Sequence, residues 1–352
     1  MPAEWELHQG TILTWPHIPK GEKDHPHWPG HYQTIPALWA RMVKELEAGE
    51  DVHVVIHDDE TEAIAKAEMK KAKVQGDRVH LHRIPNNFTW VRDNGPIVVK
   101  NAKGDRLFLD WKHNAWGGQW EYELDDKVST LLAKELGQPS LDVPMILEGG
   151  SIDVNGLGTL MTTENCLLNP NRNPGLWKEQ IENTLRDYLG VKKILWLGQG
   201  IQGDDTSGHV DDLARFVGPS TVVTIVNDDP DDPDYHPLQD NLRRLRSMTD
   251  QDDNPLTVRT ISQPRPVLVH DQPPSKATYD PSTGFRIPAS YANFYIANEV
   301  VLLPVFRDFN DVEAIRVLEE SFPKRKIVQI DSKDLTWGFG SFHCITQQIP
   351  AA

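Results

Sequence analysis

One pattern returns five times along this 352-residue chain, and it constrains the fold more than any other feature of the sequence. Each copy begins with a polar or acidic cluster, continues as a short apolar strand, turns at Gly, Asn or Asp, and returns as a second strand. An amphipathic helix and a further strand follow. The copies begin near residues 90, 148, 208, 290 and 342. This recurrence is typical of one supersecondary unit repeated with loops of variable length.

The predicted hairpins pair residues 90–99 with 106–111, 148–154 with 158–162, 208–217 with 221–226, 291–296 with 300–305, and the Cys344 strand with 11–15. The last pairing joins the two ends of the chain and would close the units into a ring. Helices are predicted at 34–49, 60–73, 125–137, 174–190, 236–248 and 309–322. We therefore predict an α/β fold in a single domain, residues 1–352. The alternative is an ordinary α+β sandwich with coincidental hairpins.

Composition indicates a globular protein and narrows the range of partners. Hydrophobic residues make up 38% of the chain, which is enough for a large core. The formal net charge of −16 argues against nucleic acid or an anionic membrane as a partner and permits a cationic ligand. The N-terminal residues are acidic where a signal peptide is basic, and no stretch approaches membrane-spanning length. We therefore expect a cytoplasmic protein.

Cys344 is the strongest candidate for a nucleophile. It is one of only two cysteines, and it follows a glycine-containing segment, 338–343, in which small residues let a ligand approach closely. The alternative is a buried structural thiol on a terminal strand. The other cysteine, Cys166, forms no CxxC pair, so neither a disulfide scaffold nor a zinc knuckle is expected.

His209 and Asp211 form a second candidate group. Residues two apart on a strand share a face, so both side chains could act on one ligand. By the same alternation, His343 should point away from the thiol of Cys344, which makes His209 the preferred general acid/base. An acidic neighbour raises the pKa of an imidazole and keeps it ready to protonate a leaving amine. A surface pair and a metal-bound pair are the alternatives.

Two carboxylates and two tryptophans suggest that the ligand is a planar cation. Asp93 and Glu148 could pair with the N–H donors of a guanidinium, and the indole of Trp90 could stack on its plane. Trp116 lies in a glycine-containing loop that could cover a site, although a core position is the alternative. Asp93 equally suits a turn before Gly-Pro, and Glu148 equally suits a solvent-facing strand end.

A histidine group that could suggest a metal site is interpreted as a loop. His17, His25, His27 and His31 lie in a Pro/Gly/Lys-rich stretch without helical spacing. The acidic segment 227–234 likewise lacks the ligand spacing of a calcium loop. We therefore predict no metal centre.

Several specific motifs also occur in a characteristic order. They are PAEW (2–5), WVRDNGP (90–96), EGGSI (148–152), TENCLLN (163–169), NRNP (171–174), HVD (209–211) and HCITQQ (343–348). In these motifs the chain resembles the agmatine deiminase family of the guanidino-group-modifying superfamily, over nearly its whole length. The resemblance implies a five-bladed α/β propeller (pentein) of ββαβ units with pseudo-fivefold symmetry. It also implies hydrolysis of agmatine to N-carbamoylputrescine and ammonia, a step of putrescine and polyamine biosynthesis, without a cofactor.

The resemblance further implies roles for individual residues. Cys344 would be the nucleophile, His209 the acid/base, Asp211 and Asp93 the guanidinium anchors, and Glu148 and Trp90 part of the pocket lining. The substrate would be a small cationic guanidine, and a homo-oligomer is compatible with this reading.

Two departures bear on the substrate's tail. The family's Gly-Gly-Gly-Asn run before the cysteine is Gly-Phe-Gly-Ser here, at 338–341, and Gly208 precedes the histidine where many members carry Glu. A peptidylarginine deiminase acting on arginine residues of peptides or proteins is therefore the main alternative. A metal-dependent hydrolase with His209, Asp211 and Glu148 as ligands, a non-catalytic polyamine binder and an amidinotransferase rank below hydrolysis.

Overall fold

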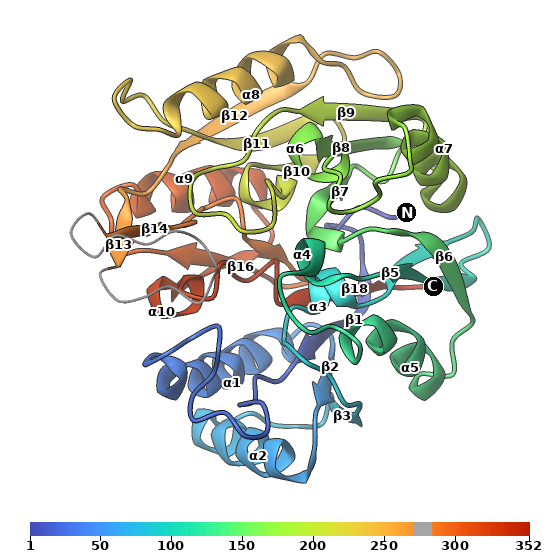
Figure 1. The fold of residues 1–352 in the computed structure, drawn as a ribbon, viewed down its shortest axis with the longest axis vertical. Coiled ribbons are helices and arrows are strands. Elements are labelled where there is room, and N and C mark those ends of the chain that lie inside the picture. Colours follow the sequence, from blue (N-terminus) through green and yellow to red (C-terminus); the bar gives the residue numbers. More distant parts are fainter. Residues whose placement is uncertain (270–283) are drawn as a thin grey trace.

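The computed structural model describes residues 1–269 and 284–352, and this part of the chain forms a mixed α/β fold (Figure 1). Its strands form five sheets of three or four strands and one two-stranded sheet. Each of the five larger sheets begins with an antiparallel pair and continues with a parallel strand. A helix connects the two parallel strands in every case, because parallel pairing requires a crossover. The five sheets with their helices are called units one to five below.

The sequence pattern predicted all five hairpin pairings. Unit one contains β18 (Thr346–Pro350), β1 (His8–Thr14), β2 (Asp51–Ile56) and β3 (Val79–Arg83). Unit two contains β4 (Ile97–Lys100), β5 (Arg106–Lys112) and β6 (Ser140–Ile146), and unit three β7 (Ile152–Val154), β8 (Thr159–Thr163) and β9 (Lys193–Leu197). Unit four contains β10 (Ala214–Gly218), β11 (Thr221–Val226) and β12 (Thr257–Ser262), and unit five β15 (Tyr295–Ile296), β16 (Val300–Val305) and β17 (Lys326–Asp331). The small sheet pairs β13 (Val267–Val269) with β14 (Phe285–Ile287).

The six predicted helices are also present, with ends that differ by a few residues. They are α1 (Ile35–Leu46), α2 (Asp59–Ala72), α5 (Val128–Glu135), α7 (Lys178–Leu189), α8 (Tyr235–Ser247) and α9 (Asp311–Ser321). The helix α2 shows why such segments are recognisable, because Asp58 caps its first turn by accepting from the Thr61 N–H. Acidic residues follow in its first turn and lysines in its last, as the helix dipole favours.

Short helices and turns precede several strands, and the sequence pattern did not predict them. They are α3 (Val91–Asn94), α4 (Ala115–Gly118), α6 (Glu164–Leu167), α10 (Lys333–Thr336) and the 3-10 turns η1 (Tyr32–Thr34), η2 (Asp125–Lys127), η3 (Gly149–Ser151) and η4 (Val210–Asp212). The first hairpin strand therefore begins later than predicted in all five units. The expectation that Asp93, His209 and Cys344 lie on strands was wrong, because each lies in a turn or short helix just before one.

Apolar packing between neighbouring units supplies the core. In the described residues, one cluster joins units one and two and includes Ile12 and Phe108. Three more clusters join units two and three, three and four, and four and five. A fifth joins unit five back to unit one and includes Val54 and Leu302. Each buried aliphatic side chain contributes roughly 1.5–3 kcal/mol, so burial stabilises the contacts between sheets that share no strand pairing.

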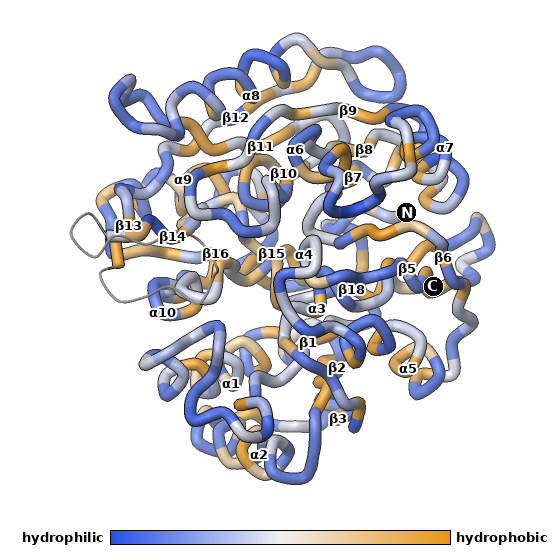
Figure 2. Tube along the Cα trace, in the orientation of Figure 1, coloured by the Kyte–Doolittle hydropathy of each residue, from blue (hydrophilic) through white to orange (hydrophobic). Residues whose placement is uncertain are grey.

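The units follow one another around the molecule, with the connecting helices toward the outside and α3, α4 and β18 near the middle (Figure 1). Figure 2 shows hydrophobic residues concentrated along the strands and polar residues along the outer helices and loops. No helix in the described ranges is long and apolar enough to cross a membrane. Most of the predicted site residues lie just before a hairpin strand, at β4, β7, β10 and β18. This arrangement therefore brings them together.

Candidate active site

Cys344 lies in the turn that leads into β18, and its thiol is held by two polar neighbours. The side-chain amide of Asn293 donates to the sulfur at 3.0 Å, and Asp211 Oδ2 lies 3.5 Å from the sulfur. Asn293 Oδ1 also accepts from the backbone N–H groups of His343 and Cys344, which fixes the turn. Burial, followed by the nearby carboxylates of Asp211, Asp212 and Asp93, raises the pKa of the Cys344 thiol well above its usual value.

Strand alternation suggested that His343 points away from this site, but its side chain faces the site. Its Nδ1 lies 2.7 Å from the same Asp211 Oδ2 that approaches the thiol, and its Nε2 lies 2.9 Å from Glu4 Oε2. Alternation failed because residues 342–345 form a turn rather than a strand. Burial alone would raise the pKa of Asp211, but His343 outweighs this effect and lowers it. Asp211 is therefore ionised beside the thiol.

His209, Asp211 and Asp93 converge around the backbone of Gly150. A Cβ atom at Gly150 would stand 2.5 Å from His209 Nδ1 and 3.0 Å from both Asp211 Oδ2 and Asp93 Oδ1. The N–H of Gly150 donates to Asp93 Oδ1 at 3.0 Å. Only a residue without a side chain fits among these groups, which explains the second glycine of the EGGSI motif. The three side chains come from units two and four, and Gly150 comes from unit three.

Glu148 lies behind His209 rather than on the cavity wall, where it was expected. Its Oε2 is 3.9 Å from His209 Nε2, while Asp93 Oδ1 is 3.9 Å from His209 Nδ1 on the other side of the ring. Arg172 Nε donates to Glu148 Oε1 at 2.6 Å. Burial would raise the pKa of Glu148, but Arg172 and His209 outweigh it and lower this pKa to about 2. Burial likewise opposes charge on His209, but its anionic neighbours, Asp93 first, raise the pKa of the imidazole well above 6.5.

A small cavity with an aromatic lining leads to the thiol. Its walls are formed by His27, Trp90, Asp93, Trp116, Trp120, Asp205, Thr206, Gly338, Phe339 and Cys344. His209 and Asp211 are fully buried beneath this surface. Burial raises the pKa of Asp93 to about 6, and burial together with Asp204 raises the pKa of Asp205 to about 8. Two carboxyl groups in one small cavity favour a ligand with two positive charges.

Both predicted tryptophans line this cavity. The indole N–H of Trp116 donates to Asp93 Oδ2 at 2.9 Å, and the indole N–H of Trp90 donates to His27 Nδ1 at 2.7 Å. Trp116 has φ +54°, a left-handed conformation that is costly for a bulky residue and that clusters at functional sites. Phe339 has φ +71°, so the departure from the family's glycine run stands where glycine would be unstrained.

Several residues of this site were not singled out from the sequence. Asn293 and Glu4 position the thiol and His343, and His27 was interpreted as part of a loop. The segment around His27 is a loop, but the imidazole is buried against Trp90, and burial lowers the pKa of His27 to about 3. Asn293 belongs to none of the motifs, and Glu4 lies in the PAEW motif, far along the chain from the others. Sequence spacing therefore did not point to either residue.

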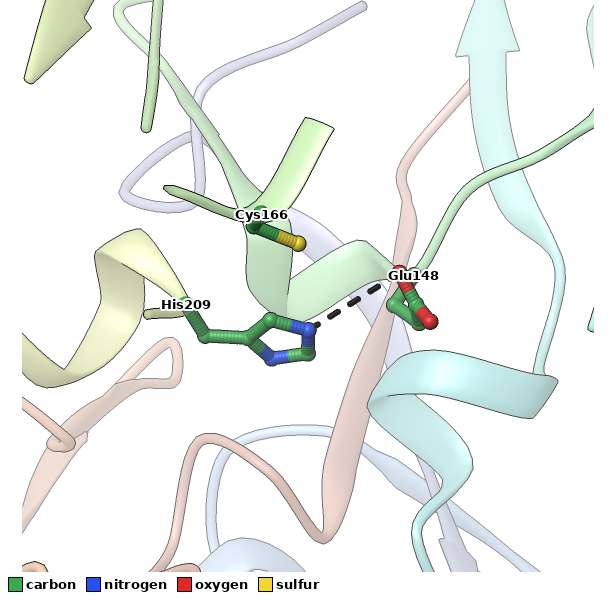
Figure 3. A group of neighbouring side chains, drawn as sticks. All are labelled: Glu148, Cys166 and His209. Carbon is green, nitrogen blue, oxygen red and sulfur yellow. Dashed lines mark ion pairs between the residues drawn. The ribbon is translucent and has the colours of Figure 1, made fainter. Parts of the chain in front are cut away.

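Two sets of side chains in the described ranges bring three potential metal ligands within 4.8 Å of one another. One set is Glu148, Cys166 and His209, and the other is Asp211, Asp212 and Cys344. The set considered from the sequence, His209 with Asp211 and Glu148, is neither of these. Figure 3 shows the first set, with the thiol and the carboxylate near the same edge of the His209 ring.

Comparison with known proteins identifies the family of this chain. The model of the Porphyromonas-type peptidyl-arginine deiminase family matches residues 1–350. A Selenomonas ruminantium protein named "Putative agmatine deiminase" is 38% identical over 363 residues, which cover 100% of this chain and 95% of that protein.

Solved structures of agmatine deiminases also match nearly the whole chain. The agmatine deiminase of Enterococcus faecalis is 34% identical with a TM-score of 0.86, and the match covers 100% of this chain and 95% of that one. A cysteine-to-serine variant of C. jejuni agmatine deiminase with substrate bound is 30% identical with a TM-score of 0.83, over 99% and 95% of the two chains. The chain therefore belongs to the Porphyromonas-type peptidyl-arginine deiminase family.

Proposed function

We propose that this chain hydrolyses agmatine to N-carbamoylputrescine and ammonia through a covalent intermediate on Cys344. The observation that carries this proposal is the meeting of a buried thiol, an imidazole and several carboxylates at the end of one aromatic cavity. The reaction places the chain among hydrolases that act on the C–N bonds of amidines, and its product is a precursor of putrescine. The named relatives support this choice of substrate.

The chemistry follows from the positions of the side chains. The Cys344 sulfur attacks the guanidinium carbon, and Asp211 is the nearest acceptor for the thiol proton. His209, which is cationic, donates a proton to the departing ammonia, and the C–N bond breaks to leave a thiouronium. Water then loses a proton to the neutral His209 and attacks this carbon. The C–S bond breaks as the proton of the added hydroxyl leaves to solvent, which releases the ureido product. Asp211 then returns its proton to the sulfur, which restores the thiol.

The positive charge of the substrate offsets the effects that raise the pKa of the Cys344 thiol. In the free enzyme, burial and the surrounding carboxylates oppose thiolate formation at Cys344. A guanidinium held by Asp93 and Asp211 brings a positive charge beside the sulfur and lowers the pKa of the thiol again. The same cation stabilises the ionised form of Asp93. The nucleophile therefore forms mainly after the substrate binds.

The size and charge of the cavity favour agmatine over a peptidyl arginine. Aromatic rings enclose the route to the sulfur, and Asp205 supplies a second carboxyl group on the same cavity. An ammonium at the end of a short alkyl tail could pair with Asp205, whereas a peptide backbone there would bury polar groups without a partner. Peptidylarginine deimination is therefore the second candidate.

A side-by-side assay tests the choice of substrate. Ammonia release should be fast with agmatine and at least roughly a hundredfold slower with free arginine and with a blocked arginine peptide. Asp205→Asn should raise KM for agmatine with little change in kcat, and Asp231→Asn, at an exposed position of the acidic segment 227–234, serves as the control. Faster turnover of the peptide than of agmatine would reverse the assignment.

Broader features of the protein fit the same proposal. The repeated ββαβ order and the five apolar clusters support a five-bladed propeller with pseudo-fivefold symmetry, which forms one catalytic domain over residues 1–352. The free thiols of Cys166 and Cys344 suit the reducing environment of the cytoplasm. No step in this scheme needs a cofactor, and a homo-oligomer is compatible with it.

A further inference from the structure

The second cysteine, Cys166, has no role in the proposed reaction, yet it lies against the imidazole that does. It belongs to the short helix α6 and is fully buried. Its sulfur, a ring nitrogen of His209 and a carboxylate oxygen of Glu148 all lie within 4.8 Å of one another. Figure 3 shows the thiol directed toward the edge of the ring whose nitrogen is joined to Glu148 by the dashed line.

Polar atoms in this group lack partners despite being buried. Among the residues that the structure describes, neither ring nitrogen of His209 has a hydrogen-bond partner, and neither does Glu148 Oε2. Arg172 bonds to the other oxygen of Glu148 and leaves Oε2 free. Nδ1 faces Asp93 on the substrate side of the ring, whereas Nε2 faces Glu148 on the opposite side. Buried polar atoms without partners are costly, so the atoms on the Glu148 side are candidates for binding a second ligand.

We propose that Cys166, His209 Nε2 and Glu148 Oε2 form a binding site for a thiophilic divalent cation such as Zn²⁺, and that the bound ion inhibits the enzyme. Thiolate, imidazole and carboxylate are the ligands that zinc takes in proteins. Zinc–ligand bonds of about 2.0–2.3 Å separate tetrahedral ligands by roughly 3.5 Å, so a modest inward shift of the three donors completes the site. A water molecule would supply the fourth ligand.

Inhibition follows from what the ion does to His209. Coordination requires the Cys166 thiol and His209 Nε2 to lose their protons, which the ion replaces. The imidazole then cannot become the cation that protonates departing ammonia. Because the substrate side of the ring is Nδ1, the ion should lower kcat and leave KM for agmatine nearly unchanged. This inhibitory part rests on the proposed function, whereas metal binding itself does not.

Cobalt titration tests binding without any need for turnover. Co²⁺ added to the full chain carrying Cys344→Ser should give a thiolate-to-metal charge-transfer band in the near ultraviolet that saturates at one ion per chain. The Cys344→Ser background removes the sulfur of the competing set with Asp211 and Asp212. Adding Cys166→Ser should abolish the band. The proposal would be overturned if a chain that keeps Cys166 shows no band, or if the band appears only when Cys344 is present.

Zinc inhibition provides the second test, with each variant compared with its own metal-free rate. Cys166→Ser should raise the Zn²⁺ concentration for half-inhibition at least about tenfold. Glu164→Gln, on the same helix but paired with Arg244, should leave it unchanged. Cys166→Ala is the second variant if the serine chain does not fold. Unchanged inhibition in a folded Cys166 variant, or inhibition that raises KM, would place the ion elsewhere. If no variant deiminates agmatine, the cobalt result still decides whether the metal site exists.

Discussion

Substitution of Gly150 by alanine should remove most of the catalytic activity while the protein still folds. The added Cβ would stand 2.5 Å from His209 Nδ1, whereas ordinary contacts begin near 3.4 Å. His209 must therefore move by about 1 Å, and a displacement of this size costs roughly a hundredfold in rate. Asp211 Oδ2 and Asp93 Oδ1, each 3.0 Å from the Cβ, must also shift by a few tenths of an ångström. Overpacking of this kind should lower the free energy of unfolding by about 1–3 kcal/mol.

The assay is kcat/KM for ammonia release from agmatine, with thermal unfolding measured on the same preparations. Gly175→Ala is the matched control, because no atom lies within 4 Å of the Cβ position there. We expect the control to retain wild-type kinetics and stability. A folded Gly150→Ala chain with more than about a tenth of the wild-type kcat/KM would refute the reasoning, since it would mean that His209 can move without loss of function.

Three further predictions concern the same cavity. Because burial raises the pKa of Asp93 to about 6, this carboxylate becomes protonated below that pH, and KM for agmatine should rise between pH 7 and pH 5; a constant KM would contradict this assignment. Phe339→Gly should relieve a positive φ but remove a cavity wall, raising KM for agmatine roughly tenfold in steady-state kinetics; an unchanged KM would show that the ring does not contact substrate. Asn293→Ala removes the 3.0 Å donor to the Cys344 sulfur, so kcat/KM should fall about ten- to a hundredfold and its alkaline limb should move to higher pH; a profile at the wild-type position would count against this contact.

The repeated units could be predicted from the sequence because their signals are local. Turn residues at Asn155-Gly156 and an apolar alternation on either side define a hairpin within a few residues. Predicted strands and helices therefore agree with the structure in order and in pairing. The residues at the start of each hairpin were placed on strands wrongly, because Gly149-Gly150 and similar sequences also suit the short 3-10 turns that the structure contains.

The candidate site could be predicted in part, since residues of chemical interest stood at the starts of the repeats. The repeat predicted that Asp93, His209 and Cys344 would meet. Asp93 and Cys344 line one cavity, and His209 is buried beneath its wall. It did not predict the partners that hold them. Glu4 reaches His343 from 339 positions away, and the distance between Cys166 and His209 depends on how two neighbouring units pack. Such contacts come from tertiary structure and leave no spacing in the sequence.

The covalent step can be tested most directly by acid quenching during turnover of agmatine, followed by mass spectrometry of the cysteine peptides. Loss of ammonia from the adduct should leave a thiouronium that adds about 113 Da to the peptide containing Cys344. The peptide containing Cys166 should be unmodified, and Cys344→Ala should give neither adduct nor ammonia. An adduct on Cys166, or ammonia release that persists in Cys344→Ala, would contradict the assignment of Cys344 as the nucleophile.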